Sequence, residues 1–283
     1  MPEHHGTCLC GTVTWTFSGE PDFASHCHCR MCRKAHGAAF GTYYFVPADR
    51  FLWTGSQSSI TGYRSSPGVT RAFCRTCGSL VPELGPDGKS VDVPAGSHDR
   101  GPAVSCHIFV DHKAPWHEIT DDLPRHGEYP SGVPGPVIQD KPLPPKPDGV
   151  VARGSCLCGI VEFEITEPFR VVHNCHCSRC RRARSAAFTT NGFTSSKGVR
   201  FLQGEGHVKH YRLPDARFFT HAFCDTCGSG LPRIDTGRKL ASIPLGALDD
   251  DPGQVPGDHI FVDDRADWYE IGGELPRFPQ APG

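Results

Sequence analysis

Two thiol-rich stretches hold the residue types best suited to chemistry in this chain. The motif CxCxxC occurs twice, at Cys27, Cys29 and Cys32 and again at Cys175, Cys177 and Cys180. Three thiolates so close together can bind one zinc ion and leave its fourth tetrahedral position open to solvent or substrate. Zinc held by three thiolates should acidify bound water poorly, but it can capture an incoming thiol as a thiolate. These motifs therefore predict thiol chemistry at a metal.

The sequence leaves other readings of the CxCxxC motif open. Cys106 could supply a fourth ligand in the first copy, and its counterpart in the second copy is Asp258, which is also a possible zinc ligand. His28 and His176 lie between cysteines, and we expect them to miss the metal because adjacent side chains of an extended segment face opposite sides. Alternatively, the thiols could remain free of metal and serve as a redox site.

A second kind of cysteine cluster predicts structural zinc. In each half, a CxC and a later CxxC are both followed by glycine. These cysteines are Cys8, Cys10, Cys74 and Cys77, and then Cys156, Cys158, Cys224 and Cys227. Glycine permits the positive φ that aims backbone amides at metal-bound sulfurs. Two such knuckles would close a Cys₄ zinc site, and buried free thiols are the alternative.

An internal repeat organises the whole chain. The second CxC and the second CxCxxC follow the first by 148 residues, and His107-Ile108-Phe109-Val110 recurs at residues 259–262. A long period with only two copies predicts tandem domains. We expect a first domain at residues 1–126, a stiff linker rich in proline and glycine at 127–152, and a second domain at 153–283.

The pattern between the motifs predicts a mainly β fold made of short strands. Polar and apolar residues alternate over 11–17 and 159–165, which is typical of strands with one buried face. Further strands are expected at 38–46, 51–53, 72–73 and 108–110, with a short helical turn after CxCxxC. The aromatic residues of these segments are expected to form the core: Trp15, Phe17, Phe40, Phe73 and Phe109.

Composition excludes several kinds of partner. The net charge of −2 comes from 29 basic and 31 acidic residues, so no overall field attracts nucleic acid or an anionic membrane. We see neither a secretory segment nor an apolar run of membrane-spanning length. Fifteen cysteines clustered in short motifs then indicate metal binding in a reducing compartment, and we expect the cytoplasm. The oligomeric state is left open, with an internal pseudo-dimer as one arrangement.

Some polar residues near the motifs allow two interpretations each. Two cations follow each CxCxxC motif, Arg33 and Lys34 in the first copy and Arg181 and Arg182 in the second. They could offset the charge of the thiolates or bind a substrate carboxylate, or they could form a solvated face. Tyr63-Arg64 and Tyr211-Arg212 could line a pocket or cover a strand surface. His36 is replaced by Arg184 in the second copy, so neither predicts a shared acid or base.

The order of these motifs resembles the glutathione-dependent formaldehyde-activating (GFA) family, also called the CENP-V/GFA domain. The resemblance rests on CxC, CxCxxC with a following Ala-Ala-Phe, Phe-Cys-x-x-Cys-Gly-Ser and His-Ile-Phe-Val, in both halves. It implies two tandem zinc-binding β-tent domains of short antiparallel strands, each with a Cys₄ structural zinc and a catalytic zinc on the CxCxxC cysteines. It also implies carbon–sulfur lyase activity that makes or cleaves S-(hydroxymethyl)glutathione.

The leading hypothesis is therefore a zinc-dependent carbon–sulfur lyase with up to two zinc ions per domain and a small thiol such as glutathione as its partner. The alternative is a zinc scaffold without catalytic activity that binds another protein. Nucleic-acid binding ranks third, because the basic residues are local.

Overall fold

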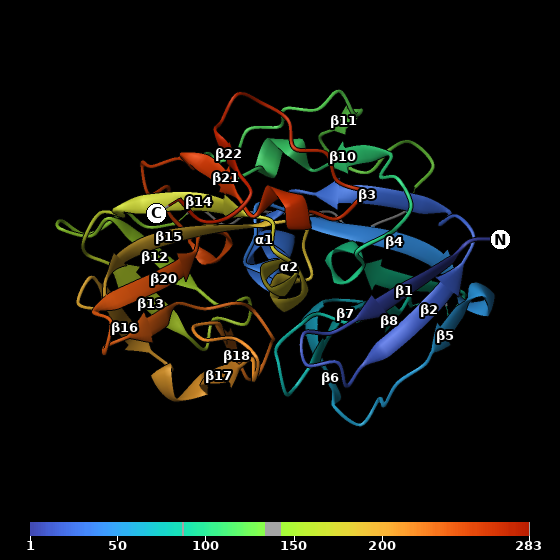
Figure 1. Cartoon of the computed structure of the whole chain (residues 1–283), viewed down its shortest axis with the longest axis horizontal. Coiled ribbons are helices and arrows are strands. Elements are labelled where there is room, and N and C mark those ends of the chain that lie inside the picture. Colours follow the sequence, from blue (N-terminus) through green and yellow to red (C-terminus); the bar gives the residue numbers. More distant parts are fainter. Residues whose placement is uncertain (87, 134–142, 283) are drawn as a thin grey trace.

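The computed structural model describes residues 1–86, 88–133 and 143–282. Each half contains short strands, one short α-helix and three 3₁₀ helices (Figure 1). The elements of the first half are β1 (Glu3–Thr7), β2 (Thr14–Ser18), β3 (Phe23–Cys27), α1 (Arg30–His36), β4 (Gly41–Pro47), η1 (Ala48–Arg50), β5 (Phe51–Trp53), β6 (Ile60–Ser66), β7 (Val69–Cys74), β8 (Glu83–Leu84), β9 (Ser90–Pro94), η2 (Ala95–Ser97), β10 (Cys106–Ile108), η3 (Val110–His112) and β11 (Arg125–His126). The elements of the second half are β12 (Ala152–Ser155), β13 (Glu162–Ile165), β14 (Val171–Cys175), α2 (Ser178–Arg184), β15 (Thr189–Ser195), β16 (Val199–Gln203), η4 (Glu205–His207), β17 (Val208–Arg212), β18 (Thr220–Cys224), β19 (Arg233–Asp235), β20 (Leu240–Pro244), η5 (Leu245–Ala247), β21 (Asp258–Ile260), η6 (Val262–Asp264) and β22 (Arg277–Phe278).

The sheets of the two halves have matching topology. Each half has a three-stranded sheet, β1-β2-β5 or β12-β13-β16, and a hairpin, β6-β7 or β17-β18. The larger sheets have the orders β11-β10-β3-β4-β9-β8 and β19-β20-β15-β14-β21-β22. The mainly β fold is thus confirmed. Most neighbours are antiparallel, but β10 and β21 run parallel to β3 and β14.

The cysteine knuckles shift some strand boundaries from their predicted positions. The strand expected at 11–17 begins only at Thr14, because Cys8 and Val13 close a turn in which the Cys8 amide donates to the Val13 carbonyl at 3.0 Å. The strand expected at 108–110 ends at Ile108. It stops there because Phe109 has a φ of 56°, which lies in the left-handed region and turns the chain into η3.

The aromatic core follows the prediction. Trp15, Phe17, Phe40, Phe73 and Phe109 are all buried, with at most 3% of each residue exposed. Burial of an aromatic side chain of this size contributes roughly 1.5–3 kcal/mol each. The core thus holds the strands that carry the cysteines.

His98 is buried in this core, and it should make stability depend on pH. The Trp15 indole N–H donates to His98 Nε2 at 3.2 Å, which requires a neutral imidazole, and burial lowers the pKa of His98 from 6.5 to about 3. As pH falls, the unfolded chain therefore binds the proton first. The stability that neutral His98 contributes is complete above pH 6.5 and is lost as the pH falls toward 3. Between these values the free energy of unfolding should fall by about 1.4 kcal/mol per pH unit for this group.

Denaturant unfolding of zinc-loaded protein between pH 6.5 and 5 checks the sign. His98→Gln can still accept from Trp15 but does not titrate, so its stability should decline less steeply than that of the wild type. Any metal held by the cysteine groups should contribute equally to both proteins. Equal slopes would show that His98 does not carry the effect.

Paired ionic contacts join the two halves near the centre of the molecule, where α1 and α2 lie (Figure 1). Helix α1 packs against η5 and helix α2 against η2. Lys34 reaches Asp249 at 2.6 Å, and Arg181 reaches Asp99 at 2.7 Å. Both cations are buried.

These contacts overturn the solvated-face interpretation for two of the cations that follow CxCxxC. Lys34 and Arg181 are buried against acidic residues of the opposite half, and Arg182 pairs with the same aspartate as Arg181. None of these three cations lines the cavities that the CxCxxC cysteines face. The sequence missed this because the partners lie in distant segments.

The two tyrosine–arginine pairs also lie between the halves. Tyr63, on β6, packs against the core of the second half, and Tyr211, on β17, packs against the core of the first. Neither tyrosine lines the two cavities that the CxCxxC cysteines face. Of the predicted linker, residues 134–142 lie outside the described residues. Within the described ranges, no helix combines the length and apolar character needed to cross a bilayer.

Candidate metal centres

Each half brings four knuckle cysteines together as the sequence predicts. The ligand sulfurs of each group lie within 4.8 Å of one another, and all fifteen cysteines are free thiols. In the first half, Cys8 Sγ lies 3.4 Å from Cys10 Sγ, which lies 3.7 Å from Cys74 Sγ. The second half gives 3.3 and 3.8 Å for the matching pairs. Four sulfurs at ~2.3 Å from one zinc ion would be about 3.8 Å apart, so the donor set fits zinc.

Backbone groups support these sulfurs. Gly11 and Gly78 have φ values of 79° and 77°, as expected for the knuckles, and their counterparts in the second half do the same. The Val13 amide donates to Cys8 Sγ at 3.4 Å. Amide hydrogens aimed at thiolates offset their negative charge and fix their orientation.

The CxCxxC cysteines form two further groups of three. Cys27 ends β3, Cys29 caps the N-terminus of α1, and Cys32 lies in the first turn of that helix. The Cys32 amide donates to Cys29 Sγ at 3.4 Å, and the Cys180 amide does the same to Cys177 Sγ. In each half the three sulfurs lie within 4.8 Å of one another, which suits one metal ion.

Among the described residues, no fourth side chain joins either group of three. Cys106 Sγ lies outside the first group, and Asp258 accepts from His173 Nδ1 at 2.5 Å instead. His28 Nε2 contacts His107 Nδ1 at 2.8 Å, which agrees with the expectation that this histidine faces away from the sulfurs. A tetrahedral ion held by these three sulfurs would therefore have a fourth position for an external ligand.

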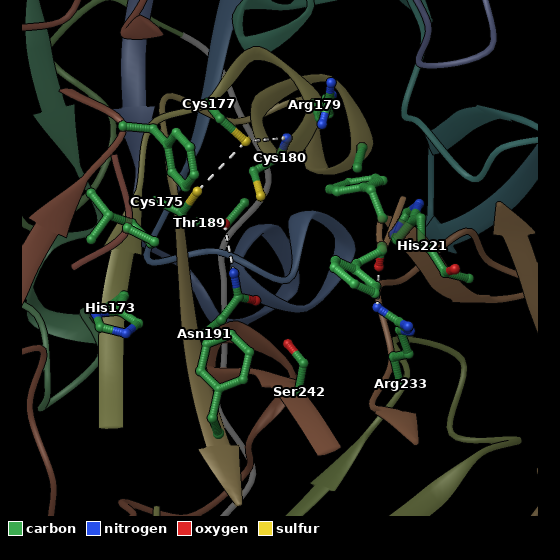
Figure 2. Close-up of a pocket in the computed structure, with 18 of the residues that line it drawn as sticks. His173, Cys175, Cys177, Arg179, Cys180, Thr189, Asn191, His221, Arg233 and Ser242 are labelled. Atoms are coloured by element: carbon green, nitrogen blue, oxygen red, sulfur yellow. Dashed lines mark hydrogen bonds between the residues drawn. The ribbon is translucent and has the colours of Figure 1, made fainter. Parts of the chain in front are cut away.

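Both groups of three face a cavity. Cys175, Cys177 and Cys180 line one of about 800 Å³, shown in Figure 2 with the three sulfurs at one end above Thr189 and Asn191. The first group lines a cavity of about 640 Å³. Volumes in this range suit a small organic ligand, so a thiol could reach the sulfurs from solvent.

Several polar neighbours of the first group were missed from the sequence. Arg71 donates to Cys32 Sγ at 3.4 Å and to the Tyr43 hydroxyl at 3.0 Å. That hydroxyl lies 2.8 Å from His36 Nε2, while His36 Nδ1 lies 2.8 Å from the Arg184 carbonyl. Since a carbonyl only accepts, Nδ1 carries the proton and Nε2 accepts from Tyr43.

Charge around the first group favours a thiolate. Hydrogen bonds from Cys27 and Cys29, together with the Arg71 guanidinium, hold the pKa of Cys32 well below its ordinary value. Burial lowers the pKa of His36 to about 4, so its imidazole stays neutral beside Tyr43. A deprotonated sulfur is the form that binds metal.

The second group has different neighbours at the matching positions. Asn191 replaces Tyr43, His221 replaces Arg71, and Arg184 replaces His36. Asn191 donates to Thr189 Oγ1 at 2.9 Å, and His221 Nδ1 lies 2.8 Å from the Cys77 carbonyl of the opposite half. Of these three differences, only the replacement of His36 by Arg184 was recognised from the sequence.

The fold and its cysteine groups thus define a duplicated β protein with two kinds of cysteine group that could each hold a metal ion. A model of the glutathione-dependent formaldehyde-activating enzyme (GFA) family matches residues 3–112 and 151–264, and the chain belongs to this family. The match over two regions confirms the tandem copies.

Two curated proteins and one solved structure are similar to this chain. A putative glutathione-dependent formaldehyde-activating enzyme of Halomonas elongata is 26% identical over 132 residues, which cover 43% of this chain and 82% of that protein. An uncharacterized lyase of Schizosaccharomyces pombe is 28% identical over 81 residues, covering 29% of this chain and 57% of that protein. A crystal structure of a Rhodobacter sphaeroides protein is 25% identical with a TM-score of 0.28, covering 37% of this chain and 97% of that one.

Proposed function

We propose that this protein is a zinc-dependent carbon–sulfur lyase that joins a small thiol to an aldehyde and cleaves the adduct in reverse. Membership of the GFA family supports this, as do the names of the two curated relatives, a formaldehyde-activating enzyme and a lyase. The observation that carries the proposal is the group of three sulfurs that lacks a fourth side chain and faces a cavity in each half. Glutathione and formaldehyde are the substrates that the family name suggests.

Zinc bound to the three CxCxxC cysteines would supply a site that holds the substrate thiol as a thiolate. In the forward direction the S–H bond breaks and its proton passes to solvent, and a C–S bond forms between the sulfur and the aldehyde carbon. The electron pair of the C=O π bond moves to the oxygen, which takes a proton from solvent. The same events in reverse release thiol and aldehyde.

The protein side chains set the charge and shape around this step. In the first half, Arg71 faces Cys32 and offsets part of the charge that the thiolates accumulate. The Tyr43 hydroxyl lines the same cavity as the sulfurs, and because its proton is donated to His36, its oxygen can accept a hydrogen bond from the hydroxyl group of the adduct. His36 accepts from this hydroxyl and thereby fixes its position.

The proposal assigns up to two zinc ions to each half, and so up to four to the chain. The Cys₄ groups hold the structural ions and the CxCxxC groups the catalytic ones. We keep the domain boundaries at 1–126 and 153–283 as part of this proposal.

Exchange spectroscopy tests the activity directly. Glutathione and ¹³C-labelled formaldehyde exchange with their adduct at a measurable uncatalysed rate, and zinc-loaded protein should increase the exchange rate between free and adduct signals above that rate in both directions. Protein stripped of metal by a chelator provides the control. If zinc-loaded protein left the exchange rate at the uncatalysed value, both for glutathione and for other small thiols, the proposal would be refuted.

A further inference from the structure

The two cavities differ strongly in charge although the cysteines that face them are the same. The second cavity is lined by six arginines and by two acidic residues, Asp235 and Asp264. These arginines are Arg170, Arg179, Arg184, Arg217, Arg233 and Arg238. Among the described residues, the first cavity is lined by one arginine, Arg71, and by Glu83 and Asp92. A ligand with carboxylates would therefore be attracted to the second cavity and repelled from the first.

A pair of linked differences places Arg184 in the second cavity. The matching residues of the first half are His36 for Arg184 and Leu80 for Gly230. A Cβ atom added to Gly230 would lie 1.1 Å from Arg184 Nη1, so the guanidinium occupies the space that a side chain there would need. Among the described residues, Arg184 Nη1 has no hydrogen-bond partner. The second half thus holds a guanidinium N–H that an anionic ligand could bind.

The mouth of the second cavity is also cationic. Phe218 is 49% exposed, and the guanidinium carbons of Arg217 and Arg238 lie 4.7 and 4.5 Å from its ring centroid. Arg233 donates to the Phe218 carbonyl at 2.6 Å and pairs with Asp235 at 2.8 Å. Figure 2 shows Arg233 and His221 on one side of the cavity, with Arg179 near Cys180. The ring and the salt bridge hold these guanidinium groups together at one wall.

Both cavities have apolar walls, but the apolar wall of the first is not accompanied by a group of arginines. Aromatic rings from several elements line it: Phe23, Tyr43, Phe45, Phe109 and Tyr129. Its one arginine, Arg71, already donates to Cys32 Sγ and to the Tyr43 hydroxyl. An apolar thiol would bury its surface here, whereas a carboxylate would meet Glu83 and Asp92 without an arginine of its own.

We infer that the two sites serve thiols of different character: the second accepts an anionic thiol that carries carboxylates, and the first accepts an uncharged, apolar one. This inference rests on the proposed thiol chemistry and extends it by giving each half its own substrate class. The duplication then widens the range of adducts that one chain can process.

Calorimetric titration of zinc-loaded full-length protein separates the two sites. Cys29→Ser leaves the second site intact, and Cys177→Ser leaves the first. Each variant is titrated with glutathione and with glutathione diethyl ester, which keeps the thiol and removes both carboxylates, and then with benzyl thiol. We expect Cys29→Ser to bind glutathione at least ~10-fold more tightly than the diester, and Cys177→Ser to prefer the diester and benzyl thiol.

A charge variant tests the cause. In the Cys29→Ser background, Arg217→Gln with Arg238→Gln should weaken glutathione binding by ~3- to 10-fold and leave diester binding unchanged, because the substituted groups are exposed and screened. Arg212→Gln removes an exposed charge that lies outside the cavity, and it should change neither.

The outcomes distinguish this inference from the proposed function. If both single variants bind thiols with the same preference, the division of substrates is wrong while thiol capture stands. If neither variant binds any thiol, thiol capture fails and the division fails with it. If Arg217→Gln with Arg238→Gln leaves glutathione binding unchanged, the charges of these arginines do not select the ligand and the inference is overturned.

Discussion

Cys74→Ser should unfold the first half of the protein and strongly destabilise the second. Cys74 ends β7, and its sulfur groups with those of Cys8, Cys10 and Cys77. Structural zinc contributes roughly 10–16 kcal/mol to folding in small zinc domains, which is comparable with the entire stability of a typical domain. Loss of one thiolate leaves a buried, incomplete site that cannot provide this free energy.

The damage should spread across the middle of the molecule. Phe73 next to Cys74 and Phe223 next to Cys224 belong to one buried cluster with Ala35 and Leu80. Loss of the first knuckle would therefore expose apolar surface of the second half. The melting temperature of Cys74→Ser should therefore lie about ten degrees or more below that of the wild type. A loss of several kcal/mol in the free energy of unfolding produces a shift on this order in a chain of this length.

Cys106→Ser provides the matched control. Cys106 is buried and free, and it lies outside the groups of four and three. Its replacement should cost about 1–3 kcal/mol, the cost of a new buried hydroxyl. If Cys74→Ser and Cys106→Ser lowered the melting temperature equally, the Cys₄ group would not be a structural metal site.

Cys29→Ser combined with Cys177→Ser should abolish turnover and preserve the fold. Both cysteines cap the N-terminus of a helix, and serine is a good residue at that position, so the helices should survive. Each change removes one of three sulfurs that hold the proposed catalytic ion. Loss of a residue that only supports a metal ligand already lowers metal affinity or activity by ~10- to 100-fold. Loss of a ligand itself should therefore lower the exchange rate with the preferred thiol by at least ~100-fold.

The single variants divide this effect between the halves. Each should remove the activity of one site and retain the other, while far-ultraviolet circular dichroism and the two Cys₄ ions remain unchanged. A scaffold without catalytic activity would instead lose fold or partner binding in these variants. Full turnover in the double variant would exclude the CxCxxC cysteines from the reaction.

Much of the site follows from the sequence because metal ligands are short-range motifs. The spacing of Cys8 and Cys10, and the glycine after each knuckle, predict the Cys₄ groups that the structure brings together. The alternation around Trp15 and Phe17 likewise predicts their burial. In these cases residues close in sequence determine the local geometry.

The missed features all depend on partners that are distant in the chain. Lys34 pairs with Asp249, and Arg71 on β7 reaches Cys32 in α1, yet neither pair has a spacing that the sequence could reveal. The strand boundary at Phe109 also differs, because a left-handed backbone at a phenylalanine has no sequence signal. In these places the tertiary structure, and not the local sequence pattern, determines the conformation and the contacts.

The central claim is that each CxCxxC group binds a metal ion with one position open to an external thiol. Cobalt substitution tests it most directly, since a new thiolate ligand adds sulfur-to-cobalt charge-transfer absorption. We predict that glutathione and benzyl thiol, added together, give absorption equivalent to one new sulfur at each of two cobalt ions per chain, and that Cys29→Ser and Cys177→Ser each remove half of it. A spectrum that no thiol changes would contradict the account.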